Sequence, residues 1–208
     1  MANNKIISKT VDVQLHIFSS PKFKSVVADA LSFLESTPVH KLPPKASFNG
    51  VGVYLLYYNG PSTYYKNIAV SNKAAFVKPI YAGKAVPEGW RRARVPVTGN
   101  SKTLFRRLNE HANSINQCRG LSLKHFYCRF MILNGVESDL ITAVEAELIR
   151  KFQPLWNSTI DGFGNHDPGL GRSNQAKSEW DILHPGRLWA NKLTGDQIKR
   201  KDIIKKLK

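Results

Sequence analysis

The sequence predicts an α+β fold built around one small sheet, and three features indicate it. A β-branched and aromatic run at 51–58 ends at a turn-like Asn-Gly-Pro, which is typical of a strand. Two segments, 102–117 and 137–152, carry apolar residues at helical spacing. Strand-like segments at 78–84 and 123–133 complete the order strand, strand, helix, strand, helix.

The composition indicates the kind of partner. The 208 residues are enough for one sizeable core, and an apolar fraction of 42% with a charged fraction of 22% is ordinary for a globular protein. The 31 Lys and Arg against 15 Asp and Glu leave a formal net charge of +16. Such an excess predicts a polyanionic partner, with nucleic acid the first candidate and an anionic membrane surface the second.

Other features concern location and metal binding. No apolar run approaches the roughly 20 residues that cross a bilayer, and the polar start, 1–5, lacks the apolar core of a signal peptide. Cys118 and Cys128 have neither CxxC spacing nor enough partners for structural zinc. His166 and His184, without nearby thiols, are expected to build loop structure. We therefore expect a cytoplasmic protein with reduced cysteines and no membrane partner.

Residues 1–49 are expected to form an arm that packs on the domain. Within them, 11–18 alternate apolar and polar residues, which suits a strand or a segment leading into a helix. Residues 22–36 have mostly helical spacing, with Pro21 near the start, and a Pro-rich connector covers 38–47.

Longer segments separate or follow the predicted elements. A polar and aromatic insert covers 59–77, and a Gly- and Arg-rich loop covers 85–101. Residues 157–192 are rich in Gly, Pro, Asn and His and are expected to be mostly loop. A basic amphipathic tail follows at 196–208, whose lysines are expected to attract phosphate backbones nonspecifically or to aid solubility.

Two short motifs lie on the first two predicted strands, Gly-Val-Tyr at 52–54 and Tyr-Ala-Gly at 81–83. On paired strands, Tyr54 and Tyr81 can lie side by side on one face, while the two glycines let another group approach the backbone. Either motif alone is more typical of an ordinary strand than of a functional site, because strands are rich in tyrosine.

Arg107 and His111 are four residues apart on the first predicted core helix and therefore share a face. A guanidinium forks onto two phosphate oxygens and stays charged in any environment. A histidine beside a phosphate can orient or deprotonate water. The alternative is a solvated basic helix face, of which the neighbouring Arg106 is a candidate member.

Taken together and in this order, these residues, followed by Glu145 and Asn157, resemble the GIY-YIG nuclease domain over residues 50–158. The resemblance implies a small antiparallel three-stranded sheet flanked by helices. It also implies hydrolysis of a phosphodiester with one metal ion held by a single glutamate. This chain has Val and Ala where the two motifs carry Ile, and its two inserts are longer than usual.

The resemblance also assigns the metal ligand. From Glu145 an apolar helix leads to Gln-Pro and then to Asn157, twelve positions on, which is the form in which the family carries its glutamate. Glu137, Asp139 and Glu147 are the alternative carboxylates. Glu145 is expected to hold Mg²⁺, with Mn²⁺ as a substitute, because a carboxylate is the hard oxygen ligand that magnesium prefers. Asn157 is expected to fix a loop or a catalytic water, or to be an ordinary turn residue.

In the implied mechanism, water attacks the scissile phosphorus in line with the leaving 3′ oxygen. Tyr54, assisted by His111, takes the proton of the water, and which of the two is the general base is left open. Because a tyrosine titrates near about 10, this role needs nearby positive charge, for which Lys84 and the metal ion are candidates. Arg107 and Tyr81 are expected to stabilise the pentacovalent oxyanions.

The last third of the chain indicates which subgroup of GIY-YIG nucleases the chain resembles. Residues 162–169, Arg172 and 180–187 resemble the C-terminal part of the GIY-YIG restriction enzymes that cut the palindrome CCGCGG. We therefore expect a Type II restriction endonuclease that acts as a homodimer on double-stranded DNA in a prokaryotic cytoplasm, with 159–208 as a DNA-binding and dimer extension. A cognate DNA methyltransferase is the expected companion. The alternatives are a homing or repair GIY-YIG nuclease and a noncatalytic basic binding module.

The basic residues suggest which side chains read the site. A G·C-rich site is read in the major groove by Arg or Lys bidentate to guanine. Arg91, Arg92 and Arg94 in the loop are the first candidates, and Arg172 and Arg187 are the next. Simple contact with phosphate is equally open for each of them.

Overall fold

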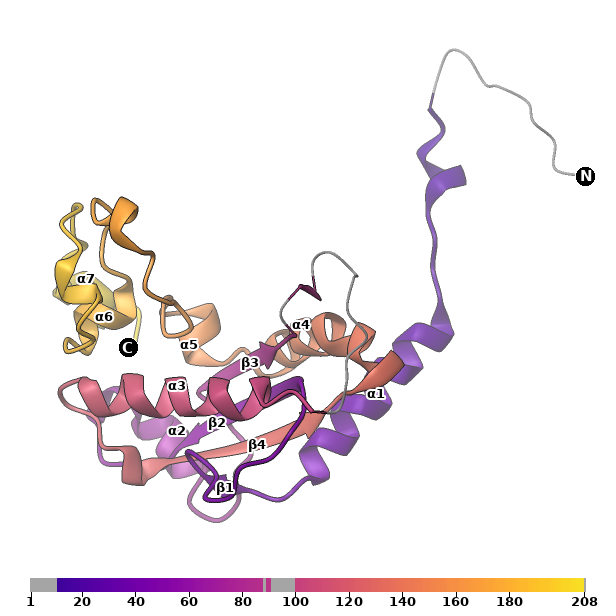
Figure 1. Cartoon of the computed structure of the whole chain (residues 1–208), viewed down its shortest axis with the longest axis horizontal. Coiled ribbons are helices and arrows are strands. Elements are labelled where there is room, and N and C mark those ends of the chain that lie inside the picture. The colour runs from indigo at the N-terminus through magenta and orange to yellow at the C-terminus, as the bar shows by residue number, and fades with distance from the viewer. Residues whose placement is uncertain (1–10, 88, 91–99, 208) are drawn as a thin grey trace, which may run out of the picture.

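The computed structural model describes residues 11–87, 89–90 and 100–207 (Figure 1). Its centre is a four-stranded antiparallel sheet in the order β1-β4-β2-β3. The α+β class and the three predicted strands are confirmed, and a short fourth strand comes from the Pro-rich connector. The strands are β1 (His40–Lys41), β2 (Gly52–Tyr58), β3 (Tyr81–Ala85) and β4 (Phe126–Ile132).

Helices flank this sheet, and the three predicted helices correspond to α1, α3 and α4. The α-helices of the described residues are α1 (Pro21–Ser36), α2 (Lys66–Ser71), α3 (Thr103–Gln117), α4 (Ile141–Phe152), α5 (Leu155–Ser158), α6 (Glu179–Leu183) and α7 (Arg200–Lys205). Short 3₁₀ helices are η1 (Val13–His16), η2 (Thr63–Tyr65), η4 (Leu123–His125), η5 (Gly135–Leu140), η6 (Leu170–Arg172) and η7 (Ala190–Lys192).

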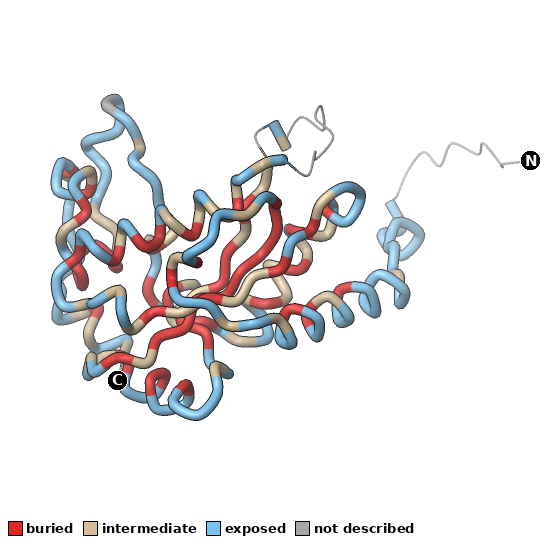
Figure 2. The backbone as a smooth tube through the Cα atoms, turned by 60° about the horizontal axis from the view of Figure 1, so that its bottom comes forward, coloured by how far each residue is buried: buried red, intermediate tan, exposed pale blue. Residues whose placement is uncertain are grey.

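The sheet has a buried layer on each face, which Figure 2 shows as red segments at the centre of the molecule. All seven residues of β2 are buried, because this strand lies between β3 and β4 and is covered on both sides. Val53 and Leu55 pack in one cluster with residues of α1 and α4, whereas Tyr54 and Leu56 pack in another with residues of α3. The side-chain alternation of a strand therefore directs the tyrosine of the first motif toward α3.

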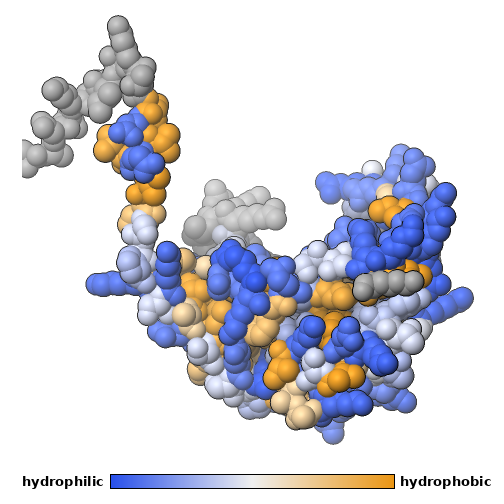
Figure 3. Space-filling view, turned by 180° about the vertical axis from the view of Figure 1, so that it is seen from behind, coloured by the Kyte–Doolittle hydropathy of each residue, from blue (hydrophilic) through white to orange (hydrophobic). Residues whose placement is uncertain are grey.

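α1 docks on the core, but the segment before it does not. Val27, Leu31 and Leu34 face the cluster shared with α4. Residues 11–18 contain η1, are all exposed and extend away from the body of the molecule (Figure 1). No described strand pairs with them, so the strand prediction was wrong and the alternative, a segment leading into a helix, holds. Its apolar side chains, seen as an orange group at one end of the molecule in Figure 3, are Val11, Val13, Leu15, Ile17 and Phe18.

The insert at 59–77 contributes to the core. α2 buries Ile68, and Asn72 is buried directly after this helix. The amide of Asn72 donates to the carbonyls of Tyr58 at 3.1 Å and Lys78 at 2.9 Å, and its oxygen accepts from the N–H of Lys78 at 2.9 Å. These bonds close the insert between the end of β2 and the start of β3, which supports the pairing of the two motif-bearing strands.

The last third forms a small helical layer at one end of the molecule (Figure 1). α6 and α7 pack on each other and Ile203 is buried, so the basic tail is in part a docked helix. Cys118 and Cys128 are free and buried. Among the helices of the described residues, none combines the length and the apolar character that crossing a bilayer requires.

Candidate active site

Antiparallel pairing brings the two tyrosine motifs together. Tyr54 lies opposite Gly83, and Tyr81 lies opposite Leu56, so both tyrosines project from the same face as diagonal neighbours. Their ring centroids are 6.3 Å apart. The predicted side-by-side arrangement of the tyrosines is confirmed.

The two motif glycines occupy positions where a side chain would not fit. A Cβ on Gly83 would lie 2.4 Å from Oη of Tyr54. A Cβ on Gly52 would lie 2.0 Å from the carbonyl oxygen of Met131, and Gly52 has a φ of +152° that side chains disfavour. Gly52 therefore lets β4 approach closely, and Gly83 leaves room for the hydroxyl of Tyr54.

α3 covers this face of the sheet and presents His111 to Tyr54. Leu108 and Ile115 are buried at helical spacing and fix the side of α3 that faces the sheet. His111, on the same side and 1% exposed, has Nε2 2.5 Å from Oη of Tyr54. Burial, and then the charge of Arg107, lowers the pKa of His111 well below its usual value. The imidazole is therefore neutral, and its Nε2 is hydrogen-bonded with the Tyr54 hydroxyl.

The tyrosines are held in their neutral form. Burial raises the pKa of Tyr54 well above 10 and also raises the pKa of Tyr81. In both cases the positive charge of Arg107 lowers the pKa and so favours the ionised phenol. Arg107 is therefore the cation that can assist proton removal from this pair.

Lys84 and Glu145 form an ion pair at the edge of the sheet. Lys84 lies opposite Val53 in the strand pairing, so it projects from the face on which α4 packs. Its Nζ lies 2.7 Å from Oε2 of Glu145. Lys84 was expected to assist Tyr54. Its charge is paired with Glu145, and a cation that lowers the pKa of Tyr54 is Arg107.

Glu145 is the carboxylate that suits a metal ion at this site. Its negative charge raises the pKa of both Tyr54 and Tyr81, so it lies within electrostatic reach of both phenols. Within the described ranges, no group of three or more His, Cys, Asp or Glu side chains is arranged to hold a metal ion. A single carboxylate completed by water and phosphate oxygens fits Mg²⁺, which keeps several waters. The neighbouring Glu147 pairs instead with Arg150 on the same helix.

Asn157 fixes the backbone of β3. Its Oδ1 accepts from the N–H of Ala82 at 2.8 Å, and its Nδ2 donates to the carbonyl of Ala82 at 2.9 Å. β3 is at the edge of the sheet, so these two bonds take the place of a further strand. Of the roles expected for Asn157, the structure shows the fixing of the chain. The left-handed Gln153, with φ of +42°, ends α4 and turns the chain toward this position.

A loop of the C-terminal part, residues 162–167 (the 162–167 loop), completes the site. The ring of Phe163 stacks on His111, with centroids 4.6 Å and planes 18° apart. A Cβ on Gly164 would lie 2.4 Å from Oη of Tyr81, so this glycine lets the loop approach the second tyrosine. These residues were not predicted to act here. Their glycines and aromatic ring can be read in the sequence, but no local pattern indicates that they contact α3, which lies much earlier in the chain.

Arg107 links α3 to the 162–167 loop. Its Nη2 donates to the carbonyl of Gly164 at 2.7 Å, and its Nη1 lies 2.8 Å from a ring nitrogen of His166. Nη1 also donates to Oε2 of Glu110 at 2.8 Å. α3 and the loop border a cavity of about 190 Å³, and the Arg107 side chain, 16% exposed, lines it. A ligand in this cavity can therefore reach the guanidinium.

The predicted DNA contacts have different outcomes. Arg91, Arg92 and Arg94 lie outside the described residues. Arg172 is exposed at the end of η6. Arg187 is 1% exposed and pairs with Asp181. The expectation of a DNA contact by Arg187 is corrected, because a buried guanidinium with occupied donors cannot reach a base edge.

The comparison with known families agrees with this geometry. The model of the Eco29kI GIY-YIG domain matches residues 46–208, a span that includes both tyrosine motifs, α3, α4 and the 162–167 loop. No curated protein gave a match. The chain therefore belongs to the Eco29kI GIY-YIG family of restriction endonucleases, and it is a restriction-type nuclease whose substrate is DNA.

Proposed function

We propose that this chain is a Type II restriction endonuclease that hydrolyses double-stranded DNA at the palindrome CCGCGG with a divalent cation held by Glu145. The observation that carries the proposal is the 2.5 Å contact between Tyr54 Oη and His111 Nε2 beside the guanidinium of Arg107. Together these three side chains offer a proton acceptor and a phosphate-binding cation at one place.

Tyr54 can act as a base although its own pKa is raised, because the neutral imidazole of His111 is hydrogen-bonded to its hydroxyl. A free phenolate is costly at this buried position. When Tyr54 Oη takes a proton from the attacking water, it can pass its own proton along the hydrogen bond to His111 Nε2. The bond between the water oxygen and phosphorus forms while the bond between phosphorus and the 3′ oxygen breaks, and the proton ends on the imidazole.

Arg107 and Tyr81 are placed to stabilise the phosphate oxygens. The guanidinium fork matches two oxygens, and its partners Gly164, Glu110 and His166 hold it beside the cavity. Burial raises the pKa of Tyr81, so its hydroxyl keeps its proton and can donate it in a hydrogen bond to a developing oxyanion.

Mg²⁺ is the proposed cofactor, with Mn²⁺ as a substitute. When bound to Glu145, it would neutralise the charge that develops on the leaving 3′ oxygen. The chain orients the carboxylate through Lys84, whose Nζ lies 2.7 Å from it. Asn157 in turn fixes β3, the strand that carries both Lys84 and Tyr81.

The palindrome implies the partners. Both strands of such a site present the same sequence, so two copies of the active site are needed, and we propose a homodimer on DNA. The net charge of +16 supports a polyanionic substrate through counterion release. A DNA methyltransferase that protects the same sites is the proposed companion, in a prokaryotic cytoplasm. The proposed contacts to guanine or phosphate are Arg91, Arg92, Arg94 and Arg172.

The direct test uses a plasmid of known sequence that contains CCGCGG sites, incubated with Mg²⁺ or with EDTA. Discrete Mg²⁺-dependent fragments whose ends map to CCGCGG support the proposal, and fragments that map to another palindrome refute the site while keeping the enzyme class. A smear or nicks point to a homing or repair nuclease, and uncut but retarded DNA points to a noncatalytic binding module. Glu145→Gln protein, purified in parallel, controls for contaminating nucleases.

A further inference from the structure

We propose that Arg187 is a positioning residue for the cleavage reaction. Together with Asp181 it clamps the 162–167 loop, and the loop in turn holds His111 and Arg107. The inference rests on the proposed function, because it concerns the geometry of the same site. It gives the C-terminal part of the chain a role in catalysis in addition to DNA contact.

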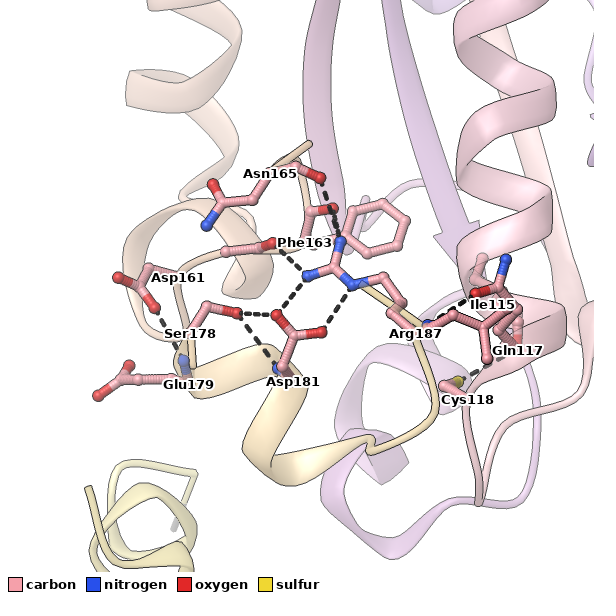
Figure 4. A network of polar contacts seen from close by, with 12 residues as sticks. Ile115, Gln117, Cys118, Asp161, Phe163, Asn165, Ser178, Glu179, Asp181 and Arg187 are labelled. Carbon is pink, nitrogen blue, oxygen red and sulfur yellow. Dashed lines mark hydrogen bonds and ion pairs between the residues drawn. The ribbon is translucent and has the colours of Figure 1, made fainter. Parts of the chain in front are cut away.

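The guanidinium of Arg187 uses all of its donors, as Figure 4 shows. Nε and Nη2 donate to the two carboxylate oxygens of Asp181, at 2.6 and 2.7 Å. The other bonds reach main-chain carbonyls of the loop: Nη2 to Gly162 at 2.8 Å, and Nη1 to Phe163 at 3.0 Å and to Asn165 at 3.3 Å. A guanidinium has five N–H groups in a rigid fork, which matches these five bonds.

The ion pair is deeply buried, with side chains 1% and 2% exposed. The guanidinium contacts the rings of Trp180 and Trp189, at 4.7 and 4.6 Å from their centroids, and the hydroxyl of Ser178 donates to Asp181 at 2.7 Å. Taking two charges out of water costs about as much as their attraction returns, so a buried pair is weak evidence for stability. Its geometric effect on the loop better explains why the pair is present.

The 162–167 loop connects the buried ion pair to His111 and Arg107. Phe163, whose carbonyl accepts from Arg187, stacks its ring on His111. Gly164 lies between two clamped residues, and its carbonyl accepts from Nη2 of Arg107 at 2.7 Å. Each clamped carbonyl therefore belongs to a residue that contacts a proposed catalytic side chain, or to its immediate neighbour.

Arg187→Lys tests the clamp while it keeps a positive charge beside Asp181. A lysine can pair with the carboxylate, but it cannot also span three carbonyls. The matched control is Glu179→Gln, which removes an ion pair with Lys206 from the same part of the chain. The pair joins Glu179 of α6 to Lys206, directly after α7, and neither residue makes an ion pair with the described 162–167 loop.

Three quantities are measured well below the unfolding temperature. They are the single-turnover cleavage rate with Mg²⁺, the Kd for uncut DNA without metal, and the NMR shifts of the His111 ring protons, which sense the stacked ring of Phe163. We expect Arg187→Lys to lower the rate by about 10- to 100-fold, since a misplacement of about 1 Å can cost about 100-fold. The Kd should be unchanged and the His111 signals displaced, whereas Glu179→Gln should leave the cleavage rate and the His111 signals unchanged.

A folded Arg187→Lys protein with an unchanged rate, or with a lowered rate but unmoved His111 signals, overturns the proposal. If the unaltered chain cuts no DNA, the proposed function fails on its own, and unmoved His111 signals then overturn the clamp independently. If the lysine variant does not fold, Asp181→Asn is measured in the same way, because it keeps the shape of the side chain and removes its charge. Displaced His111 signals support the clamp, and unmoved signals overturn it.

Discussion

The hydroxyl oxygen of Tyr54 lies 2.5 Å from Nε2 of His111, and both side chains are almost wholly buried. The contact joins the central strand β2 to α3. Burial raises the pKa of the phenol and lowers the pKa of the imidazole, so both groups are neutral before substrate binds. A proton can pass between them when water is deprotonated, and we therefore infer that the two side chains act as one acid–base unit.

Tyr54→Phe removes the hydroxyl and keeps the ring. We expect the single-turnover cleavage rate to fall by about 10²–10⁴-fold, the usual contribution of general acid–base catalysis, with DNA binding retained. Tyr57→Phe is the control, because Tyr57 lies on the same strand but packs on the opposite face with Phe76. Full cleavage by Tyr54→Phe with intact binding would eliminate this tyrosine as the base.

Arg107→Lys keeps the charge and removes the fork. We expect cleavage to slow by about 10²–10³-fold, as when one donor to a transition-state oxyanion is lost. The contacts of the guanidinium to Gly164 and Glu110 also depend on its shape. Arg106→Lys is the control in single-turnover assays, because Arg106 is exposed and bonds to Thr103 within its own helix. Equal rates for the two variants would contradict a specific role for Arg107.

The parts of the fold that the sequence predicted are those whose pattern is local. β2 is a β-branched and aromatic run, and α3 and α4 carry apolar stripes, so each could be found without knowing its neighbours. Residues 11–18 alternate as a strand does, but a strand also needs a partner edge, and no described strand provides one. β1, only two residues long, exists because it meets β4.

The same contrast holds in the site. The tyrosines and the α3 residues were grouped correctly, because the strand and helix periods fix which side chains share a face. Arg187 was misassigned, and the partner of Lys84 was not foreseen, because a basic residue has the same appearance in a sequence whether it faces DNA or a carboxylate. Only the fold shows that Glu145 and Asp181 lie beside them.

Glu145→Gln preserves the shape of the side chain and removes the charge that would bind a metal ion. We expect Mg²⁺-dependent cleavage to fall below detection while DNA binding, measured by gel retardation, is retained, because magnesium prefers a carboxylate. Glu147→Gln is the matched control on the same helix, where Glu147 pairs with Arg150. Undiminished Mg²⁺-dependent cleavage by Glu145→Gln would exclude this residue as the metal ligand.

Asn157→Ala leaves the N–H and carbonyl of Ala82 without their side-chain partner at the sheet edge. We expect a loss of about 1–3 kcal/mol in the free energy of unfolding, the usual cost of an unsatisfied buried polar group. Asn157→Asp keeps an acceptor for the N–H but sets a carboxylate oxygen against the Ala82 carbonyl, so it should destabilise at least as much. Urea denaturation checks both variants, and an unchanged midpoint would show that the two bonds between Asn157 and Ala82 are not needed for stability.

His184 should make the stability of the fold depend on pH. Burial lowers its pKa to about 4, and its Nε2 is hydrogen-bonded with the hydroxyl of Tyr65. An unfolded histidine titrates near about 6.5, so the unfolded chain takes up a proton that the folded chain rejects. The resulting stability is present above pH ~6.5 and is lost as the pH falls toward about 4, by up to about 3 kcal/mol. His111, whose pKa is also lowered, adds to the same trend.

His184→Gln should flatten this fall of stability with pH in urea denaturation, whereas His16→Gln, at an exposed position, should not. An unchanged slope for His184→Gln would mean that His184 titrates alike in the folded and the unfolded chain.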